Sequence, residues 1–159
     1  MLQIRPGDLV AIQKNDLYVD IVVLTSKLLF GGHWCFVVHN ARREISTAEV
    51  ECSSGFNAFV DLIVPKRENR LSRIRRDVDP SSIWGPSLLQ QPPLKGEKNY
   101  RIWQWKDGKR EDVEYLRFTP SPSKEELNSP HYSTFAADFA WDLASRGWMP
   151  DQSPWIEVK

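Results

Sequence analysis

Runs of apolar and β-branched residues, separated by turn-forming residues, occupy the first half of the chain. Such runs are typical of strands, and their side chains alternate between the two faces of a sheet. The dipeptides Asn15-Asp16 and Gly31-Gly32 fall between runs and favour two-residue hairpin turns. The pattern therefore predicts strands over residues 7–13, 17–25, 33–39, 59–64 and 70–78.

A further hairpin is predicted around Asp107-Gly108, a dipeptide that favours a type I′ turn. If the turn consists of these two residues, Trp103 lies opposite Asp112 and Trp105 lies opposite Arg110. The hairpin then has one mostly apolar side and one charged side that also carries both tryptophans. The apolar side holds Tyr100, Ile102, Val113 and Tyr115, and the other side holds Arg101, Trp103, Trp105 and Arg110.

The pattern changes to a helical period near the C-terminal end of the chain. Ser123 and Glu126 fit a capping box at the start of a short helix. A second helix is predicted over 130–146, with Ser129 as its N-cap and Gly147 as its C-terminal cap. The apolar stripe that is expected to face the core consists of Tyr132, Phe135, Ala136, Phe139 and Leu143.

These elements together predict an α+β fold. We expect a bent antiparallel sheet or a small SH3-like barrel, with the C-terminal amphipathic helix packed on it. The length of 159 residues predicts a single domain, 1–159. Within it, residues 1–118 form a mainly β portion, 119–148 a helical portion and 149–159 a tail. Residues 79–96 contain four prolines and two glycines and are interpreted as an irregular connection.

Composition and charge narrow the class of protein. Hydrophobic residues make up 41% and charged residues 26%, as in ordinary globular domains. Lys and Arg total 21 and so do Asp and Glu, which disfavours non-specific binding to nucleic acid. The chain has neither a signal-peptide pattern nor an apolar run long enough to cross a membrane. Two cysteines indicate reduced thiols, so we expect a cytoplasmic protein without a membrane partner.

Candidate catalytic and metal-binding groups are few. His33, Cys35 and His39 share one face of the predicted strand 33–39, with Cys52 nearby in sequence. A strand rises about 3.3 Å per residue, which places His33 about 20 Å from His39. His33, Cys35 and Cys52 could still form a metal site, and Cys35 with a histidine could form a thiol–imidazole pair. Without known ligand spacing, a nucleophile motif or a phosphate loop, we expect no metal, cofactor, catalytic residue or small-molecule ligand.

Two groups of residues are candidates for binding a protein partner. The first is the tryptophan side of the predicted hairpin, because Trp and Arg are enriched at binding hot spots. The alternative is that the C-terminal helix covers this side. The second is a basic run that either steers an acidic partner or keeps a sheet edge solvated. The candidates are Trp103, Trp105, Arg101 and Arg110, with Arg73, Arg75 and Arg76 from the run Lys66, Arg67, Arg70, Arg73, Arg75 and Arg76.

Three stretches resemble the immunity protein 26 family of bacterial polymorphic-toxin systems. They are R-P-G-D-L-V-A-I at 5–12, the P-P and Y-R-I-W elements within 92–103, and the helix end Arg146-Gly147-Trp148. Gln13 stands where the family commonly has proline, and residues 79–93 give no distinctive match.

The resemblance implies a cytosolic antitoxin that binds one cognate protein toxin and blocks its active site or its folding. Such a protein needs no catalytic residue. Another protein-binding adaptor or a phage-encoded inhibitor is an alternative function. The family is also labelled with phosphotriesterase activity, so a small hydrolase is a further alternative. Three histidines offer few ligands for the metal-activated water of that reaction.

Overall fold

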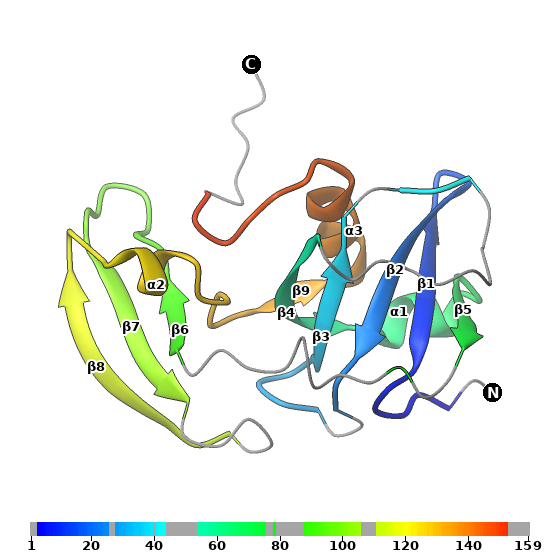
Figure 1. Cartoon of the computed structure of the whole chain (residues 1–159), viewed down its shortest axis with the longest axis horizontal. Coiled ribbons are helices and arrows are strands. Elements are labelled where there is room, and N and C mark those ends of the chain that lie inside the picture. Colours follow the sequence, from blue (N-terminus) through cyan, green and yellow to red (C-terminus); the bar gives the residue numbers. More distant parts are fainter. Residues whose placement is uncertain are drawn as a thin grey trace. The chain divides into compact units, whose positions relative to one another are not determined.

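The structure is a computed structural model that describes residues 3–25, 28–39, 41–43, 54–75, 78, 88–105 and 111–152. The chain has an α+β fold and divides into two compact units (Figure 1). Unit 1 comprises Met1–Trp84 and Thr134–Trp148, and unit 2 comprises Gly85–Ser133 and Met149–Lys159. The expected β portion, helical portion and tail do not follow these units, because strands occur in both units and the C-terminal helix belongs to unit 1.

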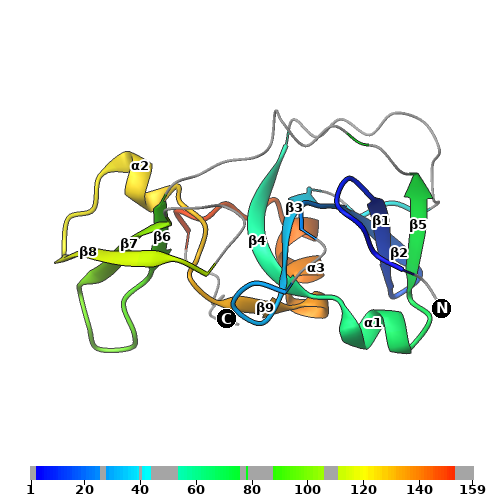
Figure 2. The same ribbon diagram turned by 90° about the horizontal axis from the view of Figure 1, so that it is seen from below.

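Unit 1 is built on a six-stranded sheet with the order β5-β1-β2-β3-β4-β9. This sheet is open, with β5 and β9 at its edges, and is not closed into a barrel. Figure 2 shows that β4 curves along its length. Five strands are antiparallel neighbours: β1 (Leu9–Lys14), β2 (Leu17–Val23), β3 (His33–Val38), β4 (Gly55–Asp61) and β5 (Leu71–Arg75). The sixth, β9 (Thr134–Ala136), runs parallel to β4, unlike the all-antiparallel sheet that was expected.

The two predicted hairpin turns of unit 1 are both present, one of them shifted. Asn15-Asp16 joins β1 to β2 with φ values of 52° and 61°, which confirms that turn. The second turn is centred on Phe30-Gly31 instead of Gly31-Gly32, since Leu29 pairs with Gly32. Gly32 is needed for a different reason: a Cβ there would lie 2.9 Å from the backbone nitrogen of Val60.

The predicted strand 59–64 ends early, at Asp61, and a short helix follows it. Helix α1 (Ile63–Arg67) begins where the Asp61 carboxylate accepts a hydrogen bond of 2.9 Å from the Ile63 amide. Pro65 lies in the first turn of α1, where its missing N–H has no partner within the helix in any case. Ile63 and Val64 are therefore helical and not part of the sheet.

The core of unit 1 lies between the sheet and helix α3 (Ala137–Ser145). Alternate side chains of the strands pack against this helix, as the strand pattern predicts. The opposite face is also buried, and the rings of Trp34 and Phe59 are 4.8 Å apart there. The main contributors to the α3 side of the core are Val10, Ile12, Val19, Ile21, Val23, Cys35, Val37, Phe56, Ala58, Val60, Trp141, Leu143 and Trp148.

Only the second half of the helix predicted over 130–146 is helical. The residues Thr134–Ala136 are extended because they pair with the edge of β4, and Ser129 instead follows the helix α2 (Lys124–Leu127). Ala136 is exposed and Tyr132 belongs to unit 2, so the predicted stripe is wrong at these two positions, whereas Phe139 is partly buried and packs against the core. The buried face of α3 consists of Ala137, Ala140, Trp141, Leu143 and Ala144.

The end of α3 matches the prediction. Gly147 has a φ of 68°, a value that favours glycine. The Trp148 amide donates to the Leu143 carbonyl at 3.1 Å, and the Gly147 amide donates to the Ala144 carbonyl at 3.2 Å. This is the hydrogen-bond pattern of a Schellman motif, so the predicted C-terminal cap is confirmed.

Unit 2 is built on a three-stranded antiparallel sheet with the order β6-β7-β8. Its strands are β6 (Leu88–Gln91), β7 (Tyr100–Trp105) and β8 (Val113–Thr119). Strand β6 falls within the expected irregular connection 79–96, which is therefore not irregular throughout. Helix α2 begins with the predicted capping box: the Ser123 hydroxyl accepts from the Glu126 amide at 3.2 Å, and the Glu126 carboxylate accepts from the Ser123 amide at 2.8 Å.

Two buried polar side chains hold unit 2 together. The side-chain nitrogen Nε2 of Gln90 donates to the backbone carbonyls of Leu127, Ser129 and Pro150, and the last two distances are 3.1 Å. The His131 Nε2 atom donates to the same Pro150 carbonyl at 2.9 Å. These bonds join β6, the end of α2 and the segment that begins at Met149.

Candidate protein-binding surface

The pairing of β7 with β8 differs from the predicted register. Trp105 lies opposite Val113 and Trp103 opposite Tyr115, so the connection is longer than a two-residue turn. In this register one tryptophan pairs with an apolar residue and the other with an aromatic one, and Asp112 lies outside the ladder. The difference from the predicted register is an odd number of positions, which exchanges the two sides of β8. Tyr115 therefore lies on the tryptophan side and not on the side of Ile102.

A bulge in β8 brings a second aromatic residue to the same side. The register shifts between Ile102 and Trp103, and Leu116 has no directly opposed partner. Beyond this bulge Phe118 lies opposite Arg101. Directly opposed residues of an antiparallel pair share a side. We call the resulting surface, formed by Arg101, Trp103, Tyr115 and Phe118, the aromatic face.

Ring contacts fix the side chains of the aromatic face. Trp103 stacks on Tyr132 with ring centroids 4.7 Å apart and meets the edge of Tyr115 at 5.9 Å. The guanidinium carbon of Arg101 lies 5.1 Å from the centre of the Phe118 ring. These are the arrangements that the charge distribution of an aromatic ring favours. The face is therefore ordered before any partner arrives.

The aromatic face is exposed along β8. Tyr115 is 53% exposed and Phe118 is 49% exposed, and Leu116 beside them is 45% exposed. Strand β8 is the outer strand of its sheet, with no neighbour other than β7 among the residues that the structure describes. Large apolar side chains gathered on an edge strand are typical of contact sites between proteins, so this surface is a candidate for one.

On the other side of the same strand pair the charged side chains are engaged within unit 2. The Arg117 Nε atom donates to the Glu126 carboxylate at 2.9 Å. Burial raises the pKa of Glu126, but hydrogen bonds from Arg117 and Ser123 outweigh that effect and leave the pKa below its usual value. This ion pair attaches α2 to β8, while the Arg117 side chain remains 48% exposed.

The predicted partner-binding residues of unit 2 have three outcomes. Arg101 and Trp103 lie on the aromatic face, as expected. Trp105 lies on the same side but is only 4% exposed, so the expectation of an exposed tryptophan pair is wrong. Arg110 lies outside the described residues. Neither Tyr115 nor Phe118 was among the residues predicted from the sequence to form this surface. The two residues are three positions apart, and in a regular strand only residues at an even spacing share a side, so both can lie on one side only if the strand contains a bulge.

The predicted basic residues belong to unit 1, so the structure does not assign them to the aromatic face. Arg73 is exposed on β5. Arg75 ends β5, but its side chain lies outside the described residues, as does Arg76. Arg70 is bound by Glu68 and Asp138, each at 2.8 Å.

The thiol and imidazole groups near β3 are engaged in the fold. Cys35 is fully buried, its Sγ donates to the His33 carbonyl at 3.3 Å, and burial raises the pKa of the thiol far above its usual value. His39 bonds to the Ser54 hydroxyl and to the Trp148 carbonyl. Cys52 lies outside the described residues.

Within the ranges of residues that the structure describes, no group of three or more His, Cys, Asp or Glu side chains is arranged to hold a metal ion. None of the helices in these ranges has the length and apolar character needed to cross a membrane.

Comparison with known proteins assigns no family to the chain: no family model, no curated protein and no solved structure matches it.

Proposed function

We propose that this chain is a cytoplasmic immunity protein that binds a cognate protein toxin through the aromatic face and thereby neutralises it. The observation that carries the proposal is the exposure of Tyr115 and Phe118 on an outer strand, beside Arg101 and Trp103. The immunity protein 26 resemblance of residues 5–12, 92–103 and 146–148 supplies the class of partner.

The composition of the aromatic face supports a protein partner. Tyr, Trp and Arg carry a large share of the binding energy in protein interfaces, and Phe is enriched there as well. The ring contacts of Trp103 and Arg101 hold these side chains in place, which lowers the entropy lost on binding. Binding that covers the active site of a toxin blocks it, so the proposal requires no catalytic group in this chain.

The test is a binding and protection experiment with the product of the adjacent gene as the candidate toxin. The chain and the double variant Tyr115→Ala/Phe118→Ala are each co-expressed with it. Loss of two hot-spot residues is expected to weaken binding by a hundredfold or more, on the order of 3 kcal/mol or above. Growth protection should be lost with it.

Leu94→Ala is the matched control, because Leu94 is 59% exposed in the same unit but lies outside the sheet. It should bind and protect like the unsubstituted chain. Full protection by the double variant would contradict the role of the aromatic face. Tight binding without protection would indicate a protein-binding adaptor instead of an immunity protein.

A further inference from the structure

Helix α1 exposes two apolar side chains on the surface of unit 1. Ile63 is 45% exposed and Val64 is 49% exposed, although both belong to a run that continues directly from the buried strand β4. Leu62 immediately before them is fully buried. The turn from β4 into α1 therefore exposes both apolar side chains to solvent. In a continued strand, successive side chains would point to opposite faces of the sheet.

A hollow of about 190 Å³ lies beside Ile63. It is larger than the space a single water needs and smaller than the roughly 300–1,000 Å³ of typical small-molecule sites. Its size suits one side chain of a partner better than a cofactor. The hollow is lined by Gln3, Ile4, His33, Leu62, Ile63 and Lys66, so three aliphatic side chains share its wall with three polar ones, among them the cation of Lys66.

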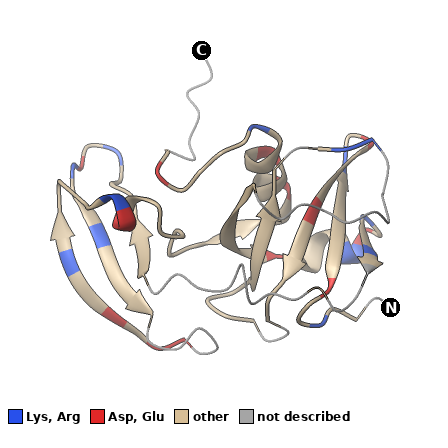
Figure 3. Ribbon diagram, in the orientation of Figure 1, with Lys and Arg blue, Asp and Glu red and all other residues tan. Residues whose placement is uncertain are grey.

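The last turn of helix α1, beside this hollow, is basic. It consists of Lys66 and Arg67, and Figure 3 shows the positive charge on this helix. Neither residue makes an ion pair with another residue that the structure describes. An unpaired cation at a surface attracts an acidic group, and this attraction acts mainly on specificity and on the rate of association.

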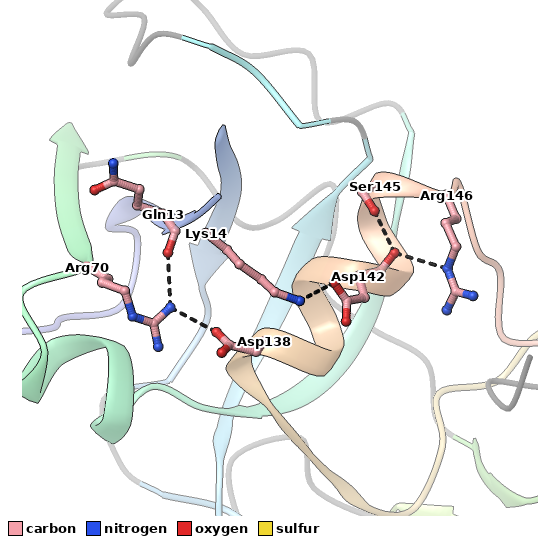
Figure 4. Close-up of polar contacts among 7 residues, drawn as sticks. All are labelled: Gln13, Lys14, Arg70, Asp138, Asp142, Ser145 and Arg146. Atoms are coloured by element: carbon pink, nitrogen blue, oxygen red, sulfur yellow. Dashed lines mark hydrogen bonds and ion pairs between the residues drawn. The ribbon is translucent and has the colours of Figure 1, made fainter. Parts of the chain in front are cut away.

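The neighbouring hollow has the opposite character. It measures about 110 Å³, lies on the Val64 side of α1 and is lined by the carboxylates Asp61 and Asp138. Its one cation, Arg70, already binds the Asp138 carboxylate at 2.8 Å and the Gln13 carbonyl at 3.0 Å (Figure 4). This side repels an acidic ligand, so the basic surface is limited to the Ile63 side.

We infer that the surface formed by Ile63, Lys66 and Arg67 is a docking site for an acidic protein segment with an apolar anchor residue. The anchor occupies the 190 Å³ hollow, and the flanking carboxylates lie against the two cations in the last turn of α1. Exposed aliphatic groups and the nearby Asp61 and Asp138 favour an acidic peptide over a nucleic acid, whose phosphates need an uninterrupted basic surface. The inference does not depend on the proposed function, because it involves no residue of unit 2.

The test uses a short synthetic peptide in which glutamates flank a central leucine. The peptide is titrated into the isotopically labelled full chain, and amide resonances are followed by NMR. Those of Leu62, Ile63 and Lys66 should shift, and the shifts should vanish at about 1 M NaCl, where the Debye length is about 3 Å. Replacing the leucine by glycine should weaken binding.

Substitutions at Lys66 and at one control position distinguish an effect of charge on binding from a loss of the folded structure. Lys66→Glu should weaken binding of the acidic peptide about tenfold or more, and Lys66→Met should have an intermediate effect. Lys95→Glu makes the same change of charge on an exposed residue of unit 2 and should bind normally. The remaining resonances of each variant report whether the fold is intact.

Three results would overturn the inference. They are no shift with the acidic peptide, equal shifts with a peptide in which lysines flank the leucine, and tighter binding of a short DNA duplex to the same residues. A negative result with the candidate toxin would leave this experiment unaffected, since the peptide is its only ligand.

Discussion

Unit 1 and unit 2 are stabilised by different kinds of buried group. Unit 1 encloses a continuous apolar core between its sheet and α3. In unit 2 the buried apolar side chains of the described strands are Leu89, Ile102 and Trp105, and the polar side chains of Gln90 and His131 are buried as deeply. Unit 2 thus relies on hydrogen bonds from buried polar groups to close a small sheet.

The two units also differ in the burial of their large aromatic side chains. In unit 1 the aromatic rings of Trp34, Phe59 and Trp148 are buried. In unit 2, Tyr115 and Phe118 remain in solvent, where they add little to stability. Because apolar burial is the main stabilising term in folding, a unit that exposes such residues gives up stability. Under the proposed function, this exposure serves the contact with a protein partner.

The largest effect is expected in the core of unit 1. Leu143→Ala should lower the free energy of unfolding by about 3–5 kcal/mol, because Leu143 is fully buried under the sheet. Phe139→Ala is the matched control on the same helix and should cost clearly less, since Phe139 is only partly buried. Urea denaturation measures both. Equal costs would show that α3 is not anchored by its buried face.

A smaller effect is expected when the polar centre of unit 2 is removed. Gln90→Ala leaves the carbonyls of Leu127, Ser129 and Pro150 without this donor, at a cost of about 2–3 kcal/mol. Hydrogen exchange should accelerate in β6 to β8 and stay unchanged in β1 to β4. Gln91→Ala, next to it on β6, should have little effect on either. Acceleration in both units would contradict the division described above.

The third expectation concerns pH. Burial lowers the pKa of His131 below its usual value of 6.5, and the bond to the Pro150 carbonyl opposes this only in part. The unfolded chain therefore binds a proton at a higher pH than the folded chain does. The contribution to stability is complete above about pH 6.5 and is lost as the pH falls toward the lowered pKa of the folded state.

His131→Gln removes this titration and retains an N–H that can donate to Pro150. We expect the unsubstituted chain to lose more stability than this variant between about pH 7.5 and about pH 5. Denaturation midpoints measured across that interval provide the comparison. Parallel pH profiles would show that His131 does not titrate differently in the folded and unfolded chain.

The capping box of α2 should contribute less. Ser123→Ala removes the acceptor for the Glu126 amide and should cost about 1 kcal/mol. The matched control is Ser121→Ala, because Ser121 is exposed and lies outside α2. Thermal unfolding of the two variants compares them directly. If both cost the same, the cap is not what stabilises the start of this helix.

The smallest effect on stability is expected at the aromatic face. Tyr115→Ala/Phe118→Ala should change the free energy of unfolding by less than about 1 kcal/mol, as surface substitutions do. Both side chains are already half exposed, so less burial is lost than at a core position. A loss of several kcal/mol would show that these rings stabilise unit 2 and would remove the reason to assign them to a partner.

Features with a local cause could be predicted from the sequence. The Asn15-Asp16 turn, the Ser123 and Glu126 capping box and the Gly147 cap each depend on residues close together in the chain. The strands β1, β2 and β3 follow from alternation and β-branched residues. In contrast, Thr134–Ala136 is extended because the edge of β4 offers it a partner, and no local pattern carries that information.

The candidate site could be predicted in part, for the same reason. Arg101 and Trp103 share a side because they are two residues apart on one strand, whatever the register. The positions of Tyr115 and Phe118 depend on the length of the β7–β8 connection and on the bulge at Leu116. The turn signal at Asp107-Gly108 predicts the wrong register. In the observed register Trp103 pairs with Tyr115 and Trp105 with Val113, and these cross-strand contacts favour a longer connection.

The parallel pairing of β9 with β4 has a consequence for synthesis on the ribosome. Strands β1 to β5 emerge first, but β9, α3 and Trp148, which complete their core, are encoded after the whole β6-to-Ser133 segment of unit 2. Until then the nascent strands present an open edge at β4 and an uncovered apolar face. Unit 1 can therefore close only after residues 85–133 of unit 2 have been translated, and unit 2 is in turn completed only by the segment that begins at Met149, whose Pro150 carbonyl binds Gln90 and His131.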